Sequence, residues 1–170
     1  MEIARADVEA KLEQHHADSF AWAMACCGRE HSEAEDVLQT SYLKVLDGRA
    51  AFASRSSFKT WLFGVIRRTA AEHRRWRAVR RFRSGTLIDP ADPSPDPATI
   101  VAHSESSARL LAALARVTER QRQLLHLVFY QDLTIAEAAA VLGISVGTAR
   151  THYERGKQRL REMLTVEDDR

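Results

Sequence analysis

The stretch TIAEAAAVLGISVGTARTHYERGKQRLREML, residues 134–164, decides how the C-terminal part of this chain folds. Thr134 and Glu137 have the spacing of a capping box, which predicts that a helix begins directly after Thr134. Gly143 follows an apolar pair of residues and predicts the left-handed turn that ends this helix. Ser145 is a favourable N-cap for a second, longer helix. The stretch therefore predicts two helices joined by a tight turn.

The second helix has one apolar and one polar face, with the 3.6-residue period of an amphipathic helix. Its inward positions are Val146, Ala149, Tyr153, Gly156, Leu160 and Leu164. The outward positions at its start are Gly147, Thr148, Arg150, Thr151, Glu154 and Arg155. A short helix, a glycine turn and a longer helix with a polar, basic start are typical of a DNA-reading helix-turn-helix. An ordinary helical hairpin with a solvated outer face is the alternative that this segment alone leaves open.

Charge is distributed unevenly along the 170 residues, although the formal net charge is only +2. Residues 1–48 contain four basic and ten acidic side chains, and residues 49–83 contain eleven basic and one acidic. Residues 84–108 carry a net charge of −4, and residues 109–164 carry +4. Two basic blocks thus alternate with acidic ones, and each basic block is a candidate for contacts with an anionic partner.

All four prolines of the chain, at positions 90, 93, 95 and 97, fall in the acidic segment LIDPADPSPDPAT. Proline removes a backbone donor and blocks helix, so this segment predicts a stiff, extended linker. No alternating pattern is long enough to predict a strand. The sequence therefore predicts an all-α fold with two small helical domains. Their bounds are residues 1–84, a linker over 85–104, and a helix-turn-helix domain over 105–170.

Three helices are predicted for the first domain. The first has helical spacing at Val8, Leu12, Phe20, Met24 and Cys27, and is expected to end at Gly28. A second capping box, Ser32 with Glu35, is expected to open the next helix. The inward positions of that helix are Val37, Leu38, Ser41, Tyr42, Val45 and Leu46. The third helix is predicted to begin near Phe58, and three helices of this length can bury one shared core.

The third helix continues into a segment with eight arginines between Arg67 and Arg83. Such a concentration of like charge destabilises a helix unless an anion neutralises it. We interpret the segment as a phosphate-contacting helix, with Trp76 and Phe82 as packing groups for bases or backbone. The alternative is a solvated face that pairs with the acidic first helix or with the acidic linker. In that case the linker occupies the DNA-binding face of the free protein.

The chain has no long apolar run and no signal-peptide pattern, which predicts a cytoplasmic protein without membrane insertion. Cys26 and Cys27 are its only cysteines and are adjacent, which argues against a disulfide framework. Together with His15, His16 and His31 they lack the spacing of a metal site, so we expect both thiols to pack in the core. The sequence contains no nucleophile–base pair and no phosphate-binding glycine loop. We therefore expect no enzyme activity, cofactor, metal or small-molecule substrate.

Three segments together resemble the extracytoplasmic-function (ECF) group of bacterial sigma factors. They are SEAEDVLQTSYLKVL at residues 32–46, FASRSSFKTWLFGVIRRTA at 52–70 and LTIAEAAAVLGISVGTARTHYERGKQRL at 133–160. The resemblance covers most of the chain in the family's order and spacing. It implies a protein that binds core RNA polymerase, recognises the −35 and −10 promoter elements and directs transcription initiation. It also implies an anti-sigma factor that holds the protein inactive.

The resemblance assigns roles to individual residues of the first domain. The helix expected to open at Ser32 implies a surface for the clamp helices of the polymerase largest subunit, formed by Asp36, Gln39, Thr40, Tyr42 and Leu46. The loop over residues 48–57 resembles the element that captures a flipped −10 base, and flipping needs a pocket outside the base stack. The residues assigned to the −10 element are Arg55, Ser56, Arg67, Arg68, Arg74 and Arg75.

For the −35 element, the matching residues that face the major groove are Arg150, Thr151, Glu154 and Arg155, with Ser145 and Thr148 near phosphates. Arginine reads guanine through O6 and N7, and glutamate accepts from cytosine N4. Arg150 and Arg155 are about 140° apart around a helix, so they cannot both point straight into the groove. We expect Arg150, Thr151 and Glu154 to face the bases and Arg155 to flank them.

Two other classes of function stay open at this point. One is a helix-turn-helix repressor or activator that acts without being a polymerase subunit, which a palindromic operator and a stable homodimer would favour. The other is a protein-interaction module whose basic faces meet an acidic partner protein.

Overall fold

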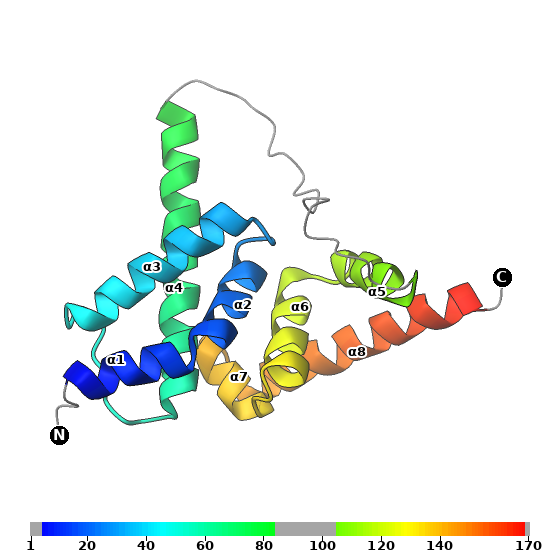
Figure 1. The fold of residues 1–170 in the computed structure, drawn as a ribbon. Coiled ribbons are helices and arrows are strands. Elements are labelled where there is room, and N and C mark those ends of the chain that lie inside the picture. Colours follow the sequence, from blue (N-terminus) through cyan, green and yellow to red (C-terminus); the bar gives the residue numbers. More distant parts are fainter. Residues whose placement is uncertain (1–4, 84–104, 169–170) are drawn as a thin grey trace. The chain divides into compact units, whose positions relative to one another are not determined.

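The computed structural model describes residues 5–83 and 105–168, and every regular element in these ranges is a helix. The predicted all-α fold is confirmed. The chain divides into two compact units, Met1–Pro95 and Asp96–Arg170. Figure 1 draws the first from blue to green and the second from yellow-green to red. The predicted linker over residues 85–104 lies outside the described residues.

The first unit contains α1 (Arg5–Gln14), α2 (His16–Cys26), α3 (His31–Leu46) and α4 (Phe58–Arg83). Helices α2, α3 and α4 pack against one another, and α1 lies against α2 and α3. The second half of α4 extends past the other helices of this unit (Figure 1). The core therefore lies between α2, α3 and the first half of α4, while the arginine-rich half projects from it.

Trp22 is the centre of this core. Its side chain has no exposed surface, and its Nε1–H donates to the carbonyl oxygen of Phe63 at 3.0 Å. The rings of Trp22 and Phe63 stack with centroids 6.0 Å apart. Leu62 and Ile66 of α4 are also fully buried. One large side chain of α2 thus ties its helix to α4 by apolar burial and by a hydrogen bond.

The prediction of one continuous helix up to Cys27 is wrong, because the helix breaks at His15. His15 has a ψ of 11°, and its ring stacks on Phe58 with centroids 6.2 Å apart. The break reorients α2 so that Trp22 enters the core, whereas Phe20 and Met24 from the predicted apolar stripe are only half-buried. The break therefore coincides with a contact to α4, which the spacing of the apolar residues does not indicate.

The predicted capping box of Ser32 and Glu35 is also wrong. Helix α3 begins at His31, and its N-cap is Glu30, two residues before Ser32. The Glu30 carboxylate accepts the backbone N–H groups of Ser32 at 3.3 Å and Glu33 at 2.6 Å. Gly28 and Arg29 have φ values of 63° and 69° and turn the chain so that Glu30 reaches this position. An ionised carboxylate is a stronger acceptor than a serine hydroxyl, which explains why Glu30 caps the helix.

The second unit contains α5 (Glu105–Arg116), α6 (Glu119–Leu125), the π-helix η2 (His126–Tyr130), α7 (Ile135–Leu142) and α8 (Val146–Asp168). Helix α8 packs against α5, α6 and α7. Its contact with α6 is especially close, because a Cβ at Gly156 would meet Gln121 Cβ at 3.1 Å and Leu125 Cδ1 at 3.2 Å. A glycine at this point therefore lets the two helices approach each other closely.

The predicted apolar face of α8 holds along most of its length but fails at its first residue. Ala149 and Gly156 are buried, and Tyr153, Leu160 and Leu164 are half-buried. Val146 is 45% exposed. It is the first residue of the helix, at the turn from α7, where the packing partners of α8 do not cover it.

The adjacent cysteines are both buried, as predicted. Burial raises the pKa of the Cys27 thiol from its usual 9.0 to about 12, and the nearby Glu33 carboxylate acts in the same direction. The thiolate is the reactive form, so we expect Cys27 to resist alkylation in the folded protein and to react once urea unfolds it. Iodoacetamide labelling followed by mass spectrometry tests this; rapid labelling of the folded protein would contradict it.

The same raised pKa predicts a loss of stability at alkaline pH. Between pH 9.0 and about 12 the unfolded thiol loses its proton while the folded thiol keeps it. The unfolded state then binds fewer protons, so the free energy of unfolding falls as pH rises through this window. The contribution is fully present below pH 9.0. Cys27→Ala should show a shallower decline than the parent protein in denaturant titrations across this range.

Candidate nucleic-acid and polymerase interfaces

The turn between α7 and α8 has the predicted caps. The Thr134 hydroxyl accepts the backbone N–H of Glu137 at 3.2 Å, and the Glu137 carboxylate accepts the backbone N–H of Thr134 at 2.9 Å. Gly143 closes α7 with φ 61° and ψ 39°, a left-handed conformation. The Ser145 hydroxyl accepts the backbone N–H of Thr148 at 3.1 Å and caps α8. The local sequence thus fixes where the second helix of the motif begins.

The first two turns of α8 present polar side chains to solvent. Arg150, Thr151 and Glu154 are all exposed, whereas Ala149 between them is fully buried. The hydroxyls of Ser145 and Thr148 lie 2.9 Å apart at the start of the helix. Backbone N–H groups and hydroxyls at a helix N-terminus are suited to bind phosphate. In the next turn the Thr151 hydroxyl donates to the Gly147 carbonyl oxygen at 3.0 Å, and the Glu154 carboxylate lies 3.4 Å from Lys157 Nζ.

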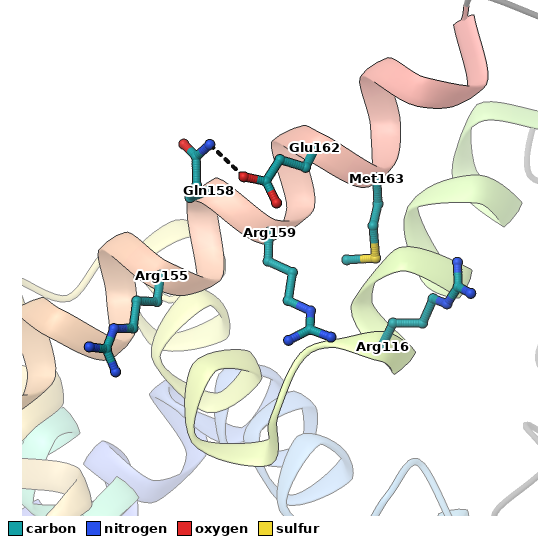
Figure 2. Close-up of a pocket in the computed structure, with 6 residues that line it drawn as sticks. All are labelled: Arg116, Arg155, Gln158, Arg159, Glu162 and Met163. Atoms are coloured by element: carbon teal, nitrogen blue, oxygen red, sulfur yellow. Dashed lines mark hydrogen bonds between the residues drawn. The ribbon is translucent and has the colours of Figure 1, made fainter.

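Arg155 belongs to a different surface from Arg150. It lines a shallow groove between α5 and α8, which is formed by Arg116, Arg155, Gln158, Arg159, Glu162 and Met163. Figure 2 shows Arg155, Arg159 and Met163 on one side of α8 and Gln158 on the other, where it donates to Glu162 at 2.8 Å. The groove adds two arginines that the sequence reasoning missed. Arg159, one turn after Arg155, was detectable from its spacing, but Arg116 on α5 was not.

Aromatic contacts hold the loop over residues 48–57 against the start of α4. The Phe52 ring lies 5.4 Å from that of Phe58 and 5.1 Å from that of Trp61, measured between centroids. The Ser57 hydroxyl accepts the backbone N–H of Thr60 at 3.1 Å and caps α4. The loop residues Arg55 and Ser56 are exposed. The loop therefore has an anchored apolar end and a polar tip that faces solvent.

A hollow lies beside this loop. It is lined by Lys44, Arg49, Ala50, Ala51, Trp61, Val65, Arg68, Thr69 and Glu72. Lys44 donates to the Thr69 hydroxyl at 3.2 Å and pairs with the Glu72 carboxylate. Of the residues predicted for the −10 element, Arg68 lies in this hollow. The hollow thus offers an aromatic face together with hydrogen-bond donors and an acceptor.

Apart from the loop residues Arg55 and Ser56, the other predicted −10 residues lie elsewhere on α4. Arg74 and Arg75 are exposed further along the helix, and Arg67 is half-buried. Some basic groups of α4 pair within the first unit, since Glu33 of α3 contacts Arg77 and His73. The alternative of a paired arginine face therefore applies to part of the helix, and the acid that pairs comes from α3.

The outer face of α3 carries exposed polar side chains. Asp36, Gln39 and Thr40 are exposed, while Tyr42 and Leu46 are half-buried. The Tyr42 hydroxyl lies 3.4 Å from His16 Nδ1, and burial raises the pKa of this phenol. Leu43 is 49% exposed and adds an apolar side chain to this face, which the sequence reasoning missed. Its position one turn after Gln39 was the available signal.

Other kinds of site are not found in the described part of the chain. No group of three or more His, Cys, Asp or Glu side chains within residues 5–83 and 105–168 is arranged to hold a metal ion. Among the helices described, none is both long and apolar enough to cross a bilayer.

Comparison with known proteins matches both units to sigma-factor families. Residues 12–80 match Sigma-70 region 2, and residues 107–160 match Sigma-70, region 4. The ECF RNA polymerase sigma factor RpoE of Cereibacter sphaeroides is 32% identical over 160 residues, which cover 92% of this chain and 86% of that protein. The ECF sigma factor SigX of Bacillus subtilis is 32% identical over 143 residues, which cover 81% of this chain and 74% of that protein.

Solved structures agree with this assignment. The sigma factor RpoE of Bartonella quintana, solved in complex with the anti-sigma factor NepR, matches with a TM-score of 0.73 and 25% identity. That match covers 94% of this chain and 98% of the other. CnrH, solved with the cytosolic domain of CnrY, has the same fold at a TM-score of 0.65 and 20% identity. The chain belongs to the extracytoplasmic-function family of RNA polymerase sigma factors.

Proposed function

We propose that the start of α8 reads the −35 element of the promoters at which this sigma factor directs transcription initiation. One observation supports this most directly, namely that α8 buries Ala149 while it exposes Arg150, Thr151 and Glu154. These three side chains lie within about one turn of each other and carry both donors and an acceptor for base edges. Ser145 and Thr148 stand at the N-terminus of the helix, where phosphate binding is favoured.

Arg155 is proposed as a flanking contact. It shares its groove with Arg116 and Arg159, and the three guanidinium groups form a basic edge beside the base-reading set. Contacts with phosphates position a protein on the duplex without reading its sequence. The groove therefore fits the DNA backbone next to the −35 element.

Arg150→Ala and Arg155→Ala separate the two roles. Loss of the Arg150 base contact should cost about 1–3 kcal/mol and relax the preference at one −35 position. Loss of the Arg155 phosphate contact should weaken binding to all sequences alike and lower the salt slope by about one unit. Holoenzymes with each variant are to be measured against a promoter library randomised across the −35 element. If Arg150→Ala lowers binding uniformly and keeps its selectivity, the base-reading role passes to Arg155.

The hollow beside the loop over residues 48–57 is proposed as the pocket for a flipped −10 base. Trp61 supplies an aromatic surface for stacking, and Arg68, Lys44 and Thr69 supply donors on its walls. Arg55 and Ser56 at the loop tip, with Arg67, Arg74 and Arg75 along α4, are then the surrounding contacts with the −10 strand. Because Arg68 is long and charged, it is a candidate for reading a base with acceptor atoms.

The exposed face of α3 is proposed as the polymerase surface, with Asp36, Gln39, Thr40, Tyr42 and Leu46 as its contacts.

Because a similar sigma factor is solved with an anti-sigma factor, we also propose an anti-sigma partner for this chain. A cytoplasmic site of action is a further part of the proposal. The domain bounds 1–84, 85–104 and 105–170 stay a proposal, and the two family matches fall inside the outer ones. A helix-turn-helix regulator that acts without polymerase is not favoured, because residues 12–80 match region 2.

A further inference from the structure

The arginines of α4 have two different environments. Arg68 and Arg75 are exposed and lie seven residues apart, about 20° from each other around the helix. Arg77 is nine residues after Arg68 and therefore about 180° away, on the opposite side of α4. There its Nη1 lies 2.8 Å from the Glu33 carboxylate of α3. Arg77, whose side chain is 41% exposed, is thus paired with α3, whereas Arg68 and Arg75 on the opposite side of α4 are open to solvent.

Glu33 is held firmly in this position. Only 11% of its side chain is exposed, and its second carboxylate oxygen lies 3.2 Å from His73 Nδ1. Its backbone N–H donates to the Glu30 carboxylate that caps α3, at 2.6 Å. A carboxylate with so little contact to water depends on its ion-pair partners, because separation would leave a poorly solvated charge. The pair with Arg77 is therefore a fixed feature of the packing between α3 and α4.

We propose that Glu33 is a positioning residue that withdraws Arg77 from the arginines available to promoter DNA. This inference rests on the proposed role of α4 in binding the −10 region. An arginine already neutralised by a carboxylate adds no net positive charge against a phosphate, so it releases no additional counterion from DNA. DNA contacts of α4 then come from its other exposed arginines, among them Arg68 and Arg75. Glu33 thereby reduces the number of arginines that α4 contributes to phosphate contacts.

The salt dependence of DNA binding tests this proposal, because its slope reports the number of phosphates neutralised. The full chain is to be titrated with a short random-sequence DNA duplex at mildly alkaline pH, where histidine is neutral. Arg77→Ala should leave the slope unchanged. Glu33→Gln should release Arg77 and make the slope steeper by about one unit. The double variant Glu33→Gln/Arg77→Ala should return to the parent slope, because the released side chain is then absent.

Two matched controls separate this inference from simpler explanations. Glu35→Gln removes the same charge from an exposed position on the same helix, with 62% of the Glu35 side chain exposed, and should not change the slope. Arg75→Ala should lower the slope by about one unit if α4 contacts DNA as proposed. An unchanged slope for Arg75→Ala would reject the DNA role of this helix face.

The remaining outcomes concern Glu33 and Arg77 alone. If Arg77→Ala lowers the slope as much as Arg75→Ala does, Arg77 is a phosphate contact and the proposal fails. It also fails if Glu33→Gln, shown by thermal unfolding to be folded, keeps the parent slope.

Discussion

Asp36→Arg combined with Gln39→Ala is expected to abolish the binding of this sigma factor to core RNA polymerase. Both side chains are exposed on α3, and the buried residues Val37 and Leu38 point the other way. A reversed charge in a complementary interface costs several kcal/mol, because a favourable pair becomes a repulsive one. The fold should stay intact, since surface substitutions away from packing contacts change stability by about 0.5 kcal/mol or less.

A pull-down with purified core polymerase measures this effect, with circular dichroism to verify the helical content. Glu13→Arg is the matched control, because Glu13 is an exposed acid on α1 of the same unit and lies outside the proposed surface. It should retain polymerase at the parent level. Full retention by the Asp36→Arg/Gln39→Ala variant would remove this face of α3 from the interface.

Trp22→Ala is expected to have the largest effect on stability, a loss of about 3–5 kcal/mol. The side chain has no exposed surface and is hydrogen-bonded to the Phe63 carbonyl oxygen, so its removal leaves a cavity between α2 and α4. Such a loss is comparable to the whole stability of a small domain, so the first unit should be largely unfolded at physiological temperature. Urea titration followed by circular dichroism measures the change.

Trp76→Ala is the matched control for this substitution. The Trp76 side chain is 56% exposed, and its principal contact is with the Arg80 guanidinium, 4.4 Å from the ring centroid. Its removal should cost no more than about 1 kcal/mol. If the two tryptophan variants unfold at the same urea concentration, the core described between α2 and α4 is incorrect.

The helix-turn-helix could be predicted well because its signals are local. Thr134, Glu137, Gly143 and Ser145 act on backbone groups within four residues of themselves, so their spacing alone indicates the caps. The start of α3 could not be predicted in the same way. Ser32 and Glu35 have suitable spacing, but the two left-handed residues before α3 bring the Glu30 carboxylate to the cap. The spacing of apolar residues does not indicate where backbone turns of this kind occur.

The candidate sites also contain features that local periodicity predicts and features that only tertiary packing produces. The exposure of Asp36 and Arg150 follows from helix periodicity, since both lie opposite buried neighbours on the same helix. The pair between Glu33 and Arg77 joins residues 44 positions apart in the sequence, and no spacing rule connects them. The groove with Arg116 and Arg159 likewise needs two helices to be packed before it exists. Periodicity predicts which side chains are outside, and tertiary packing decides which of them pair.

The glycine at position 156 has a consequence for how such a protein diversifies. A methyl group there would press on Gln121 and Leu125, so a larger residue at this position requires the contact between α8 and α6 to shift. Two turns earlier, the exposed residues of α8 support nothing in the core. Substitutions can therefore accumulate on the outer side of α8 without altering how this helix packs against its neighbours. During evolution, substitutions at these exposed positions can therefore change promoter preference while the orientation of α8 stays the same.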